Sequence, residues 1–141
     1  TTINIIEDEN LVENAAELGD YALKCLNQLK AVHPVIGDVR GRGFLIGVEL
    51  VQDRKSKTPT SDLAEDVLYR CLDKGLSFKV TMGNVLTLTP PLILNREQMD
   101  FALEAIDAKA LEAIASATKF ADDSPFPEPE ALTTDVYVSY P

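Results

Sequence analysis

Two short runs rich in branched aliphatic residues, joined by an arginine- and glycine-rich link, lie in the middle of the chain. Residues 35–39 read VIGDV, residues 43–51 read GFLIGVELV, and the link between them is Arg40-Gly41-Arg42. β-Branched and aromatic residues bounded by turn formers favour strands. We therefore expect a β-hairpin whose turn runs through residues 40–42.

Helical periodicity flanks this hairpin on both sides. Apolar residues recur at steps of three and four in segments that begin near residues 11, 62 and 95, which predicts three amphipathic helices. The apolar positions of the three stripes are Leu11, Ala15, Leu18, Ala22, Leu26 and Leu29, then Ala64, Val67, Leu68, Cys71 and Leu72, then Met99, Leu103, Ile106, Ala110 and Ile114. Each helix needs a sheet or another helix to cover its stripe.

The predicted helix ends carry residues that suit them. Asp62 and Glu65 stand three residues apart, as in a capping box, and Gly75 is a natural C-terminal stop for the second helix. Asn95 and Gln98 have the same spacing at the start of the third helix. We expect both pairs to cap their helices.

Two further strands are predicted between the second and third helices. Residues 76–80 and 85–89 are rich in branched and aromatic side chains, and Gly83-Asn84 between them favours the positive φ of a tight connection. Pro90-Pro91 then ends the ladder. The element order predicts an α+β fold, in which a small, mainly antiparallel sheet has helices packed on one face.

Charge and cysteine usage exclude several classes of function. With 13 basic and 23 acidic residues the chain has a formal net charge of -10, which disfavours nucleic acid and anionic membrane surfaces as partners. No apolar run approaches the roughly 20 residues of a membrane span. Two cysteines make no disulfide framework, which predicts a reducing, cytoplasmic compartment. The first residues show no initiator Met and no signal sequence, so we expect a part of a longer protein.

Proline marks the boundary of the folded part. Residues 122–130, DDSPFPEPE, alternate proline with acidic residues and cannot form regular helix. The chain is thereby predicted to divide into a helical segment at residues 1–34, a small α+β domain at 35–115, and a proline-rich acidic tail at 116–141 that is extended or poorly ordered.

Few residues suggest chemistry by themselves. The single histidine, His33, precedes a proline at a helix end, which favours a capping or surface role over catalysis. Cys25 and Cys71 lie in predicted helices without a CxxC motif, so we expect no metal site. The Gly41-Arg42-Gly43 run leads into a strand, whereas phosphate-binding loops lead into a helix N-terminus.

Arg40 and Arg42 are the strongest candidates for binding. Two guanidinium groups on one turn can bind a carboxylate or phosphate through paired hydrogen bonds. The alternative, which composition favours, is that one of them forms a structural ion pair with Asp38 or Glu49. The residues alone thus predict a small α+β domain with one basic turn and no self-contained active site.

Three segments resemble a known family. Residues 35–50, VIGDVRGRGFLIGVEL, are similar to the strand pair that opens the C-terminal small domain of class III pyridoxal-phosphate-dependent aminotransferases, which are fold-type I enzymes. Residues 9–15 resemble the helix that leads out of the large domain in that family, which implies that residues 1–34 are a linking helix from that domain. Residues 85–94, with Pro90-Pro91, resemble its double-proline strand. The resemblance covers about residues 5–108.

The resemblance implies an enzyme that transfers an amino group between an amine or amino acid and a 2-oxo acid. The family's large domain holds pyridoxal phosphate (PLP) through a lysine, and none of the lysines here stands in that motif, so this part alone should be inactive. A homodimer is implied as well. Two alternatives stay open: an ammonia-lyase of the same family acting on a phosphorylated or phosphonate amine, and a non-catalytic association module.

The resemblance also assigns roles to individual residues. It implies that Arg40, Gly41, Gly43 and the double proline are parts of the structural motif, and that no catalytic, cofactor-binding or metal-binding residue lies in this part of the chain. One position departs from the family pattern. Thr87 stands where many members have the arginine that binds the substrate carboxylate, so recognition of an α-carboxylate is in doubt. The alternative, which stays open, is that Thr87 is only a β-favouring strand residue and that the large domain recognises the substrate.

Overall fold

A computed structural model describes residues 1–107 of the chain. The elements, in order, are α1 (Thr2–Asp8), α2 (Leu11–Val32), β1 (Ile36–Arg42), β2 (Leu45–Leu50), α3 (Ser61–Asp73), β3 (Lys79–Thr81), β4 (Val85–Leu88) and α4 (Arg96–Ala105). The predicted helical positions Ala110 and Ile114 and the whole of the predicted tail lie outside the described residues.

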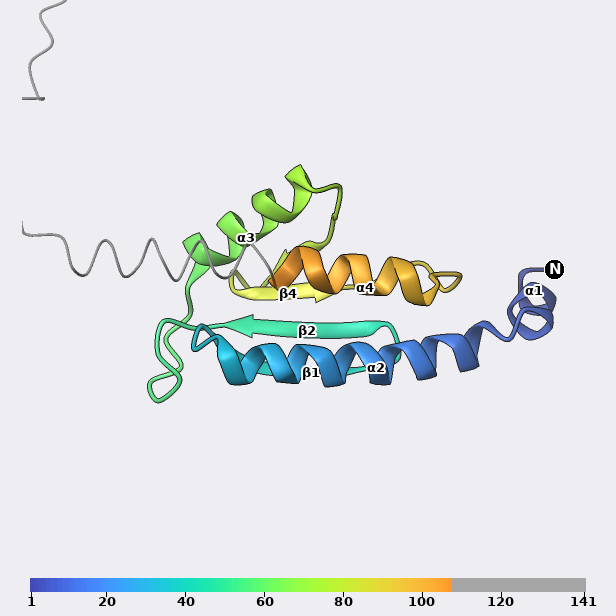
Figure 1. Cartoon of the computed structure of the whole chain (residues 1–141), viewed down its shortest axis with the longest axis horizontal. Coiled ribbons are helices and arrows are strands. Elements are labelled where there is room, and N and C mark those ends of the chain that lie inside the picture. The colour runs from blue at the N-terminus through green and yellow to red at the C-terminus, as the bar shows by residue number, and fades with distance from the viewer. Residues whose placement is uncertain (108–141) are drawn as a thin grey trace, which may run out of the picture.

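The four strands form one antiparallel sheet in the order β1-β2-β4-β3. One face is apolar, because Ile46, Val48 and Leu50 of β2 alternate with more exposed residues and Leu86 of β4 lies beside them. Helices α2, α3 and α4 contribute to the core on this face (Figure 1). The predicted α+β fold, with helices packed on one face of an antiparallel sheet, is confirmed.

The predicted position of the hairpin turn is wrong. β1 continues through Arg40 and Gly41, and Arg42 pairs with Leu45, so the turn consists of Gly43 and Phe44. Gly43 has φ +55°, a left-handed conformation that glycine adopts without a steric cost. Of the two glycines near the link, the second therefore makes the turn.

The connection between β3 and β4 also differs in detail. Met82 and Gly83 have positive φ, at 53° and 80°, whereas Asn84 does not and is instead buried. The Asn84 side chain donates a hydrogen bond of 2.8 Å from Nδ2 to the carbonyl oxygen of Leu50. Asn84 thus fixes the connection to β2. The positive φ that the sequence predicted for Asn84 is found at Met82 instead.

The helices begin and end largely where the sequence predicts. Asn95 and Gln98 form the expected capping box at the start of α4, and Gly75, with φ +83°, follows the end of α3. No capping box forms at α3, where the N-cap is Thr60 and makes no side-chain hydrogen bond. Helix α1 was not predicted, and none of its residues is buried.

Helix α2 is part of the core although residues 1–34 were expected to link two domains. Leu26 and Ala22 are almost completely buried in it. Helix α2 lies close to the hairpin turn at Gly19, where a Cβ atom would lie only 2.3 Å from the carbonyl oxygen of Gly43. The turn of the hairpin can pack this closely only because position 19 has no side chain. The domain boundaries themselves stay a prediction.

Candidate functional site

The sheet face opposite the helices gathers most of the polar residues of the strands. Residues that pair across antiparallel strands share a face, and one such row runs from Arg40 through Gly47 and Thr87 to Lys79. We call this surface the open face, because no helix of the described residues covers it (Figure 1). Its side chains include Asp38, Arg40, Arg42, Leu45, Glu49, Lys79, Thr81 and Thr87.

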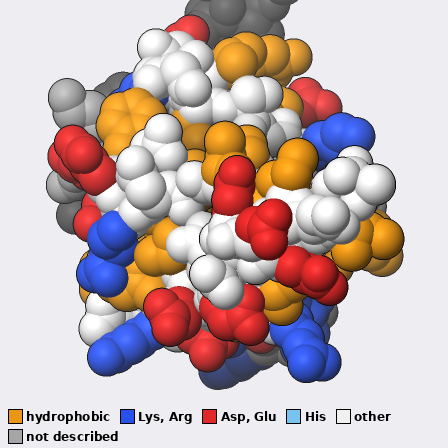
Figure 2. Space-filling view, turned by 90° about the vertical axis from the view of Figure 1, so that its right-hand side faces the viewer, with side chains coloured by type: hydrophobic (Ala, Val, Ile, Leu, Met, Phe, Trp, Pro, Cys, Tyr) orange, Lys and Arg blue, Asp and Glu red, His pale blue; other side chains and the backbone are white. Residues whose placement is uncertain are grey.

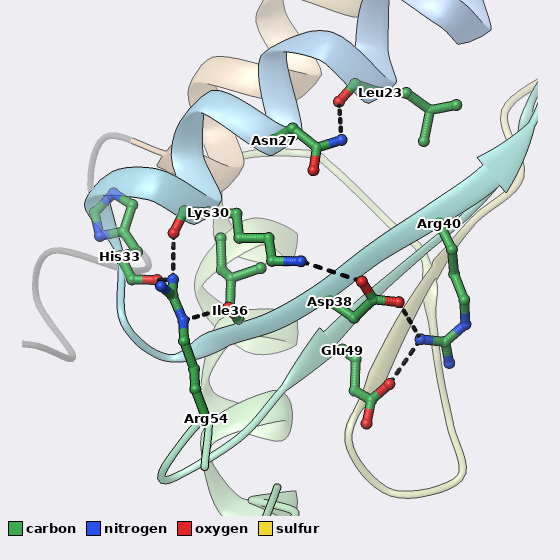
Figure 3. Close-up of polar contacts among 9 residues, drawn as sticks. All are labelled: Leu23, Asn27, Lys30, His33, Ile36, Asp38, Arg40, Glu49 and Arg54. Carbon is green, nitrogen blue, oxygen red and sulfur yellow. Dashed lines mark hydrogen bonds and ion pairs between the residues drawn. The ribbon is translucent and has the colours of Figure 1, made fainter.

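Arg40 is held in an ion pair on the open face. Its Nη1 lies 2.6 Å from Oε2 of Glu49 and 3.2 Å from Oδ2 of Asp38, and Lys30 of α2 reaches the same aspartate at 3.1 Å (Figure 3). Hydrogen bonds to Glu49 and Asp38 raise the pKa of Arg40 above its usual value. Desolvation opposes ionisation of Asp38, but hydrogen bonds from Lys30 and Arg40 outweigh it and lower the pKa of this carboxyl. The structural ion pair expected from the sequence is confirmed.

Thr87 lies in the centre of the open face, on β4. It pairs with Gly47 of β2 on one side and with Lys79 of β3 on the other. Its hydroxyl oxygen lies 2.7 Å from that of Thr81, so the two threonines share a hydrogen bond. The structure thus brings Thr87 and Arg40 into one cross-strand row, with Gly47 between them.

Lys79 and Thr81 were missed as candidate site residues. A signal for them exists in the sequence, because Phe78 and Val80 pack against the core and alternation places residues 79 and 81 on the opposite face. Which strand would lie beside them does not follow from alternation, since pairing partners are distant in sequence.

A cavity of about 500 Å³ lies on the other side of the sheet, between α4, β4 and the segment that precedes β3. Its walls are mainly apolar, and the double proline contributes to them. Lys79 is the only residue of a charged type among the described residues that line the cavity, and alternation along β3 directs its side chain to the open face. A PLP site needs a carboxylate for the ring nitrogen as well as a lysine. This cavity therefore does not fit PLP, and no reaction step through the cofactor is assigned to it.

The other residues singled out in the sequence, the histidine and the cysteines, have structural roles in the fold. The backbone N–H of His33 donates a hydrogen bond of 2.8 Å to the carbonyl of Leu29 at the end of α2, as a capping residue does. Its ring is largely buried, with Nε2 3.1 Å from Oδ1 of Asp107, which is half-exposed. Cys71 is fully buried, and desolvation raises the pKa of its thiol to about 11. Within residues 1–107, no three potential ligands come close enough to hold a metal ion.

Arg54 joins the end of α2 to the sheet. It donates hydrogen bonds to the carbonyl oxygens of Ile36, at 3.1 Å, and His33, at 2.8 Å, and also to that of Lys30 (Figure 3). Two of these carbonyls lie at or near the C-terminus of α2, where helical partners are missing. Arg54 thereby fixes the connection between α2 and β1.

One end of the molecule combines acidic and apolar side chains. Figure 2 shows this end, which carries α1 and the start of α2, with acidic side chains gathered beside apolar ones. Ile3 and Val12 are 67% and 63% exposed, and Ile93 of the β4–α4 connection is 70% exposed.

No helix among the described residues is both long enough and apolar enough to cross a bilayer.

Comparisons with known proteins agree on one family. The family described as aminotransferase class-III matches residues 1–110. A (R)-1-hydroxy-2-aminoethylphosphonate ammonia-lyase of Vibrio splendidus is 48% identical over 118 residues, which are 84% of this chain and 24% of that protein. Alanine–glyoxylate aminotransferase 2 homolog 2 of Arabidopsis thaliana is 45% identical over 107 residues, covering 74% of this chain and 22% of that protein. Racemases are also among the similar proteins.

Solved structures show the same relationship. A protein described as "Transaminase with L-ala" superimposes with a TM-score of 0.74 at 39% identity, over 82% of this chain and 27% of the other. The chain therefore spans about a quarter of the length of the proteins that it matches. On the match over residues 1–110 and on these relatives, the chain belongs to the class III aminotransferase family.

Proposed function

We propose that the chain is the C-terminal small domain of a PLP-dependent enzyme that transfers an amino group between an amine or amino acid and a 2-oxo acid. The observation that carries this proposal is the family match over residues 1–110, which includes the whole described sheet. PLP and its lysine belong, in this proposal, to a large domain upstream. The chain by itself is accordingly expected to be inactive in transamination.

The wider organisation is part of the same proposal. Residues 1–34 lead out of the large domain, residues 35–115 form the small domain, and residues 116–141 form the tail. The whole enzyme is a homodimer. Cys25 and Cys71 are free thiols, which supports a reducing, cytoplasmic compartment.

An ammonia-lyase acting on a phosphonate amine is the second candidate. Two observations favour it: the 48% identical relative is named as a lyase of this kind, and position 87 has threonine in place of the family arginine. A threonine cannot form the charged, two-pronged hydrogen bond that arginine makes with a carboxylate.

A substrate panel on the whole enzyme separates these candidates. Amino transfer is scored as amine consumption that depends on an added 2-oxo acid, and elimination as ammonia release without one. A chiral separation of the recovered amino acid scores racemisation in the same samples. Transfer that depends on the 2-oxo acid supports the first proposal, whereas ammonia release alone refutes it in favour of the lyase.

The alternative that the chain is a non-catalytic association module is tested by the visible absorbance of the whole protein. A whole protein that binds PLP through a lysine absorbs visible light, and borohydride bleaches this absorbance. Colourless whole protein that takes up no added PLP would favour the module.

Thr87 provides a sharper test of substrate recognition. In the whole enzyme, Thr87→Arg should raise kcat/KM for α-carboxylate amino donors by about tenfold or more, because a charged hydrogen bond contributes roughly 1.5–3 kcal/mol. Gln52→Arg adds the same charge in an exposed loop and serves as the control. An unchanged donor preference in steady-state kinetics would show that position 87 does not face the substrate.

A further inference from the structure

Lys79 is a direct cross-strand neighbour of Thr87 on the open face. The two residues pair directly in the β3–β4 ladder, and opposite residues of this kind have Cβ atoms about 5 Å apart. Lys79 is exposed, and none of the ion pairs formed within residues 1–107 includes it. Its ammonium group is therefore available next to a position that lacks the family's positive charge.

The other cations of the open face are less suited to this role. Arg40 lies two strands away from Thr87, about 10 Å at the usual strand spacing, with Gly47 between them. Its guanidinium is already bound by two carboxylates. Arg42 pairs with Leu45, one residue beyond the part of β2 that pairs with β4. Among the cations of residues 1–107, only Lys79 both pairs with Thr87 and takes part in no ion pair.

The two threonines add a directed hydrogen-bond donor. Their hydroxyl oxygens are 2.7 Å apart, so one hydroxyl donates to the other, and the accepting hydroxyl keeps its own hydrogen. That hydrogen, on Thr81 or Thr87, and the ammonium hydrogens of Lys79 arise from separate points on the open face. An anion with three oxygens can engage both donors through different atoms, whereas arginine presents a planar fork that matches a carboxylate.

We propose that Lys79, with the hydroxyl pair Thr81 and Thr87, binds the phosphonate group of the amine substrate. In many other family members the arginine at the position of Thr87 supplies this positive charge. Here Lys79 supplies it from the adjacent strand β3, as a compact ammonium group. This inference rests on the proposed function, with the phosphonate amine of its second candidate as the substrate and position 87 facing that substrate.

Three amines that share an aminoethyl group test the proposal in the whole enzyme. 2-Aminoethylphosphonate, β-alanine and propylamine carry a phosphonate, a carboxylate and a methyl group at the same distance from the amine. Lys79→Met removes the charge and keeps the stem, Thr81→Val removes a hydroxyl at constant shape, and Lys55→Met removes the same charge from an exposed loop as a control.

Lys79→Met should lower kcat/KM for 2-aminoethylphosphonate by about ten- to a hundredfold, the range expected for a charge-assisted hydrogen bond, and much more than for propylamine. Thr81→Val should lower it about three- to tenfold, and Lys55→Met should leave it unchanged. An equal loss on all three amines would show a structural role for Lys79 and overturn the proposal. A wild-type preference for β-alanine over the phosphonate would overturn it as well.

Binding of methylphosphonate decides the matter independently of turnover. Isothermal titration calorimetry of the whole enzyme should give a Kd that Lys79→Met raises about tenfold or more. If none of the three amines is consumed when a 2-oxo acid is present, the amino-transfer proposal fails for them, and this titration still tests the site. An unchanged Kd in Lys79→Met, or an equal change in Lys55→Met, would refute the role of Lys79.

Discussion

Replacing a glycine inside a helix by alanine usually stabilises a protein. At Gly19 we expect the opposite, because α2 is in close contact there with the hairpin turn. Gly19 is buried in the middle of α2. An added Cβ atom would lie 2.3, 2.5 and 2.6 Å from the carbonyl oxygen, carbonyl carbon and Cα of Gly43. All three atoms belong to the backbone of the turn, so no side chain can rotate away. Either the helix or the hairpin must move.

The expected magnitude follows from two opposing contributions. In an exposed helix interior, replacing glycine by alanine stabilises by about 1 kcal/mol. Overpacking of a well-packed site costs about 1–3 kcal/mol, and a backbone clash at these distances belongs near the upper end. We therefore expect Gly19→Ala to lower the free energy of unfolding by roughly 1–2 kcal/mol.

Urea denaturation followed by circular dichroism measures this change. Ala16→Gly is the matched control, because Ala16 is exposed in the same helix and reports the helix preference alone. This control should lose about 1 kcal/mol. If Gly19→Ala instead gains about as much as Ala16→Gly loses, the close contact between α2 and the turn is wrong.

Four further outcomes follow from the described residues. In the native protein at pH 8, Cys25, which is partly exposed, should react with a thiol reagent, whereas Cys71, whose pKa burial raises to about 11, should react only after unfolding, as absorbance counting will show. Arg40→Ala should lower the melting temperature more than it lowers whole-enzyme activity per bound cofactor, with a loss of about 1 kcal/mol because the ion pair is half-exposed. Asn95→Ala should cost about 1 kcal/mol in urea denaturation through loss of the capping box. The lowered pKa of Asp38 contributes stability that is present above its ordinary pKa near 4 and is lost as pH falls through its folded-state pKa, so Asp38→Asn should flatten the acid side of the stability profile.

Periodicity predicted the architecture because it reports which face of each element is buried. Leu26 in α2 and Met99 in α4 stand at the predicted apolar positions and lie in the core. The turn was misplaced because three glycines and two arginines in residues 37–43 allow several turn positions. Pairing decides between them, since Val48 must lie opposite Val39 for both to face the helices. That constraint involves two strands and cannot be read from the link alone.

The two expected capping boxes show a similar limit. Asn95 accepts a hydrogen bond of 2.9 Å from the N–H of Gln98, and the Gln98 side chain completes the box. The same spacing at Asp62 and Glu65 produces no cap, because α3 begins at Ser61 and Asp62 is already inside its first turn. Spacing therefore identifies a box only when the first helical residue is known.

The sequence could single out individual residues of the candidate site, but not that they lie side by side. The family resemblance singled out Arg40 and Thr87 separately, and only the order β1-β2-β4-β3 places both in one row with Lys79 at its end. Under the proposed role of Lys79, the strand order would let substrate recognition change while the fold is retained. A residue on the edge strand β3 can supply a charge beside position 87, so threonine can replace the family arginine there without a change in the pairing of β4. Substitutions at Lys79 should then alter which anionic group is preferred while the core beneath the sheet stays intact.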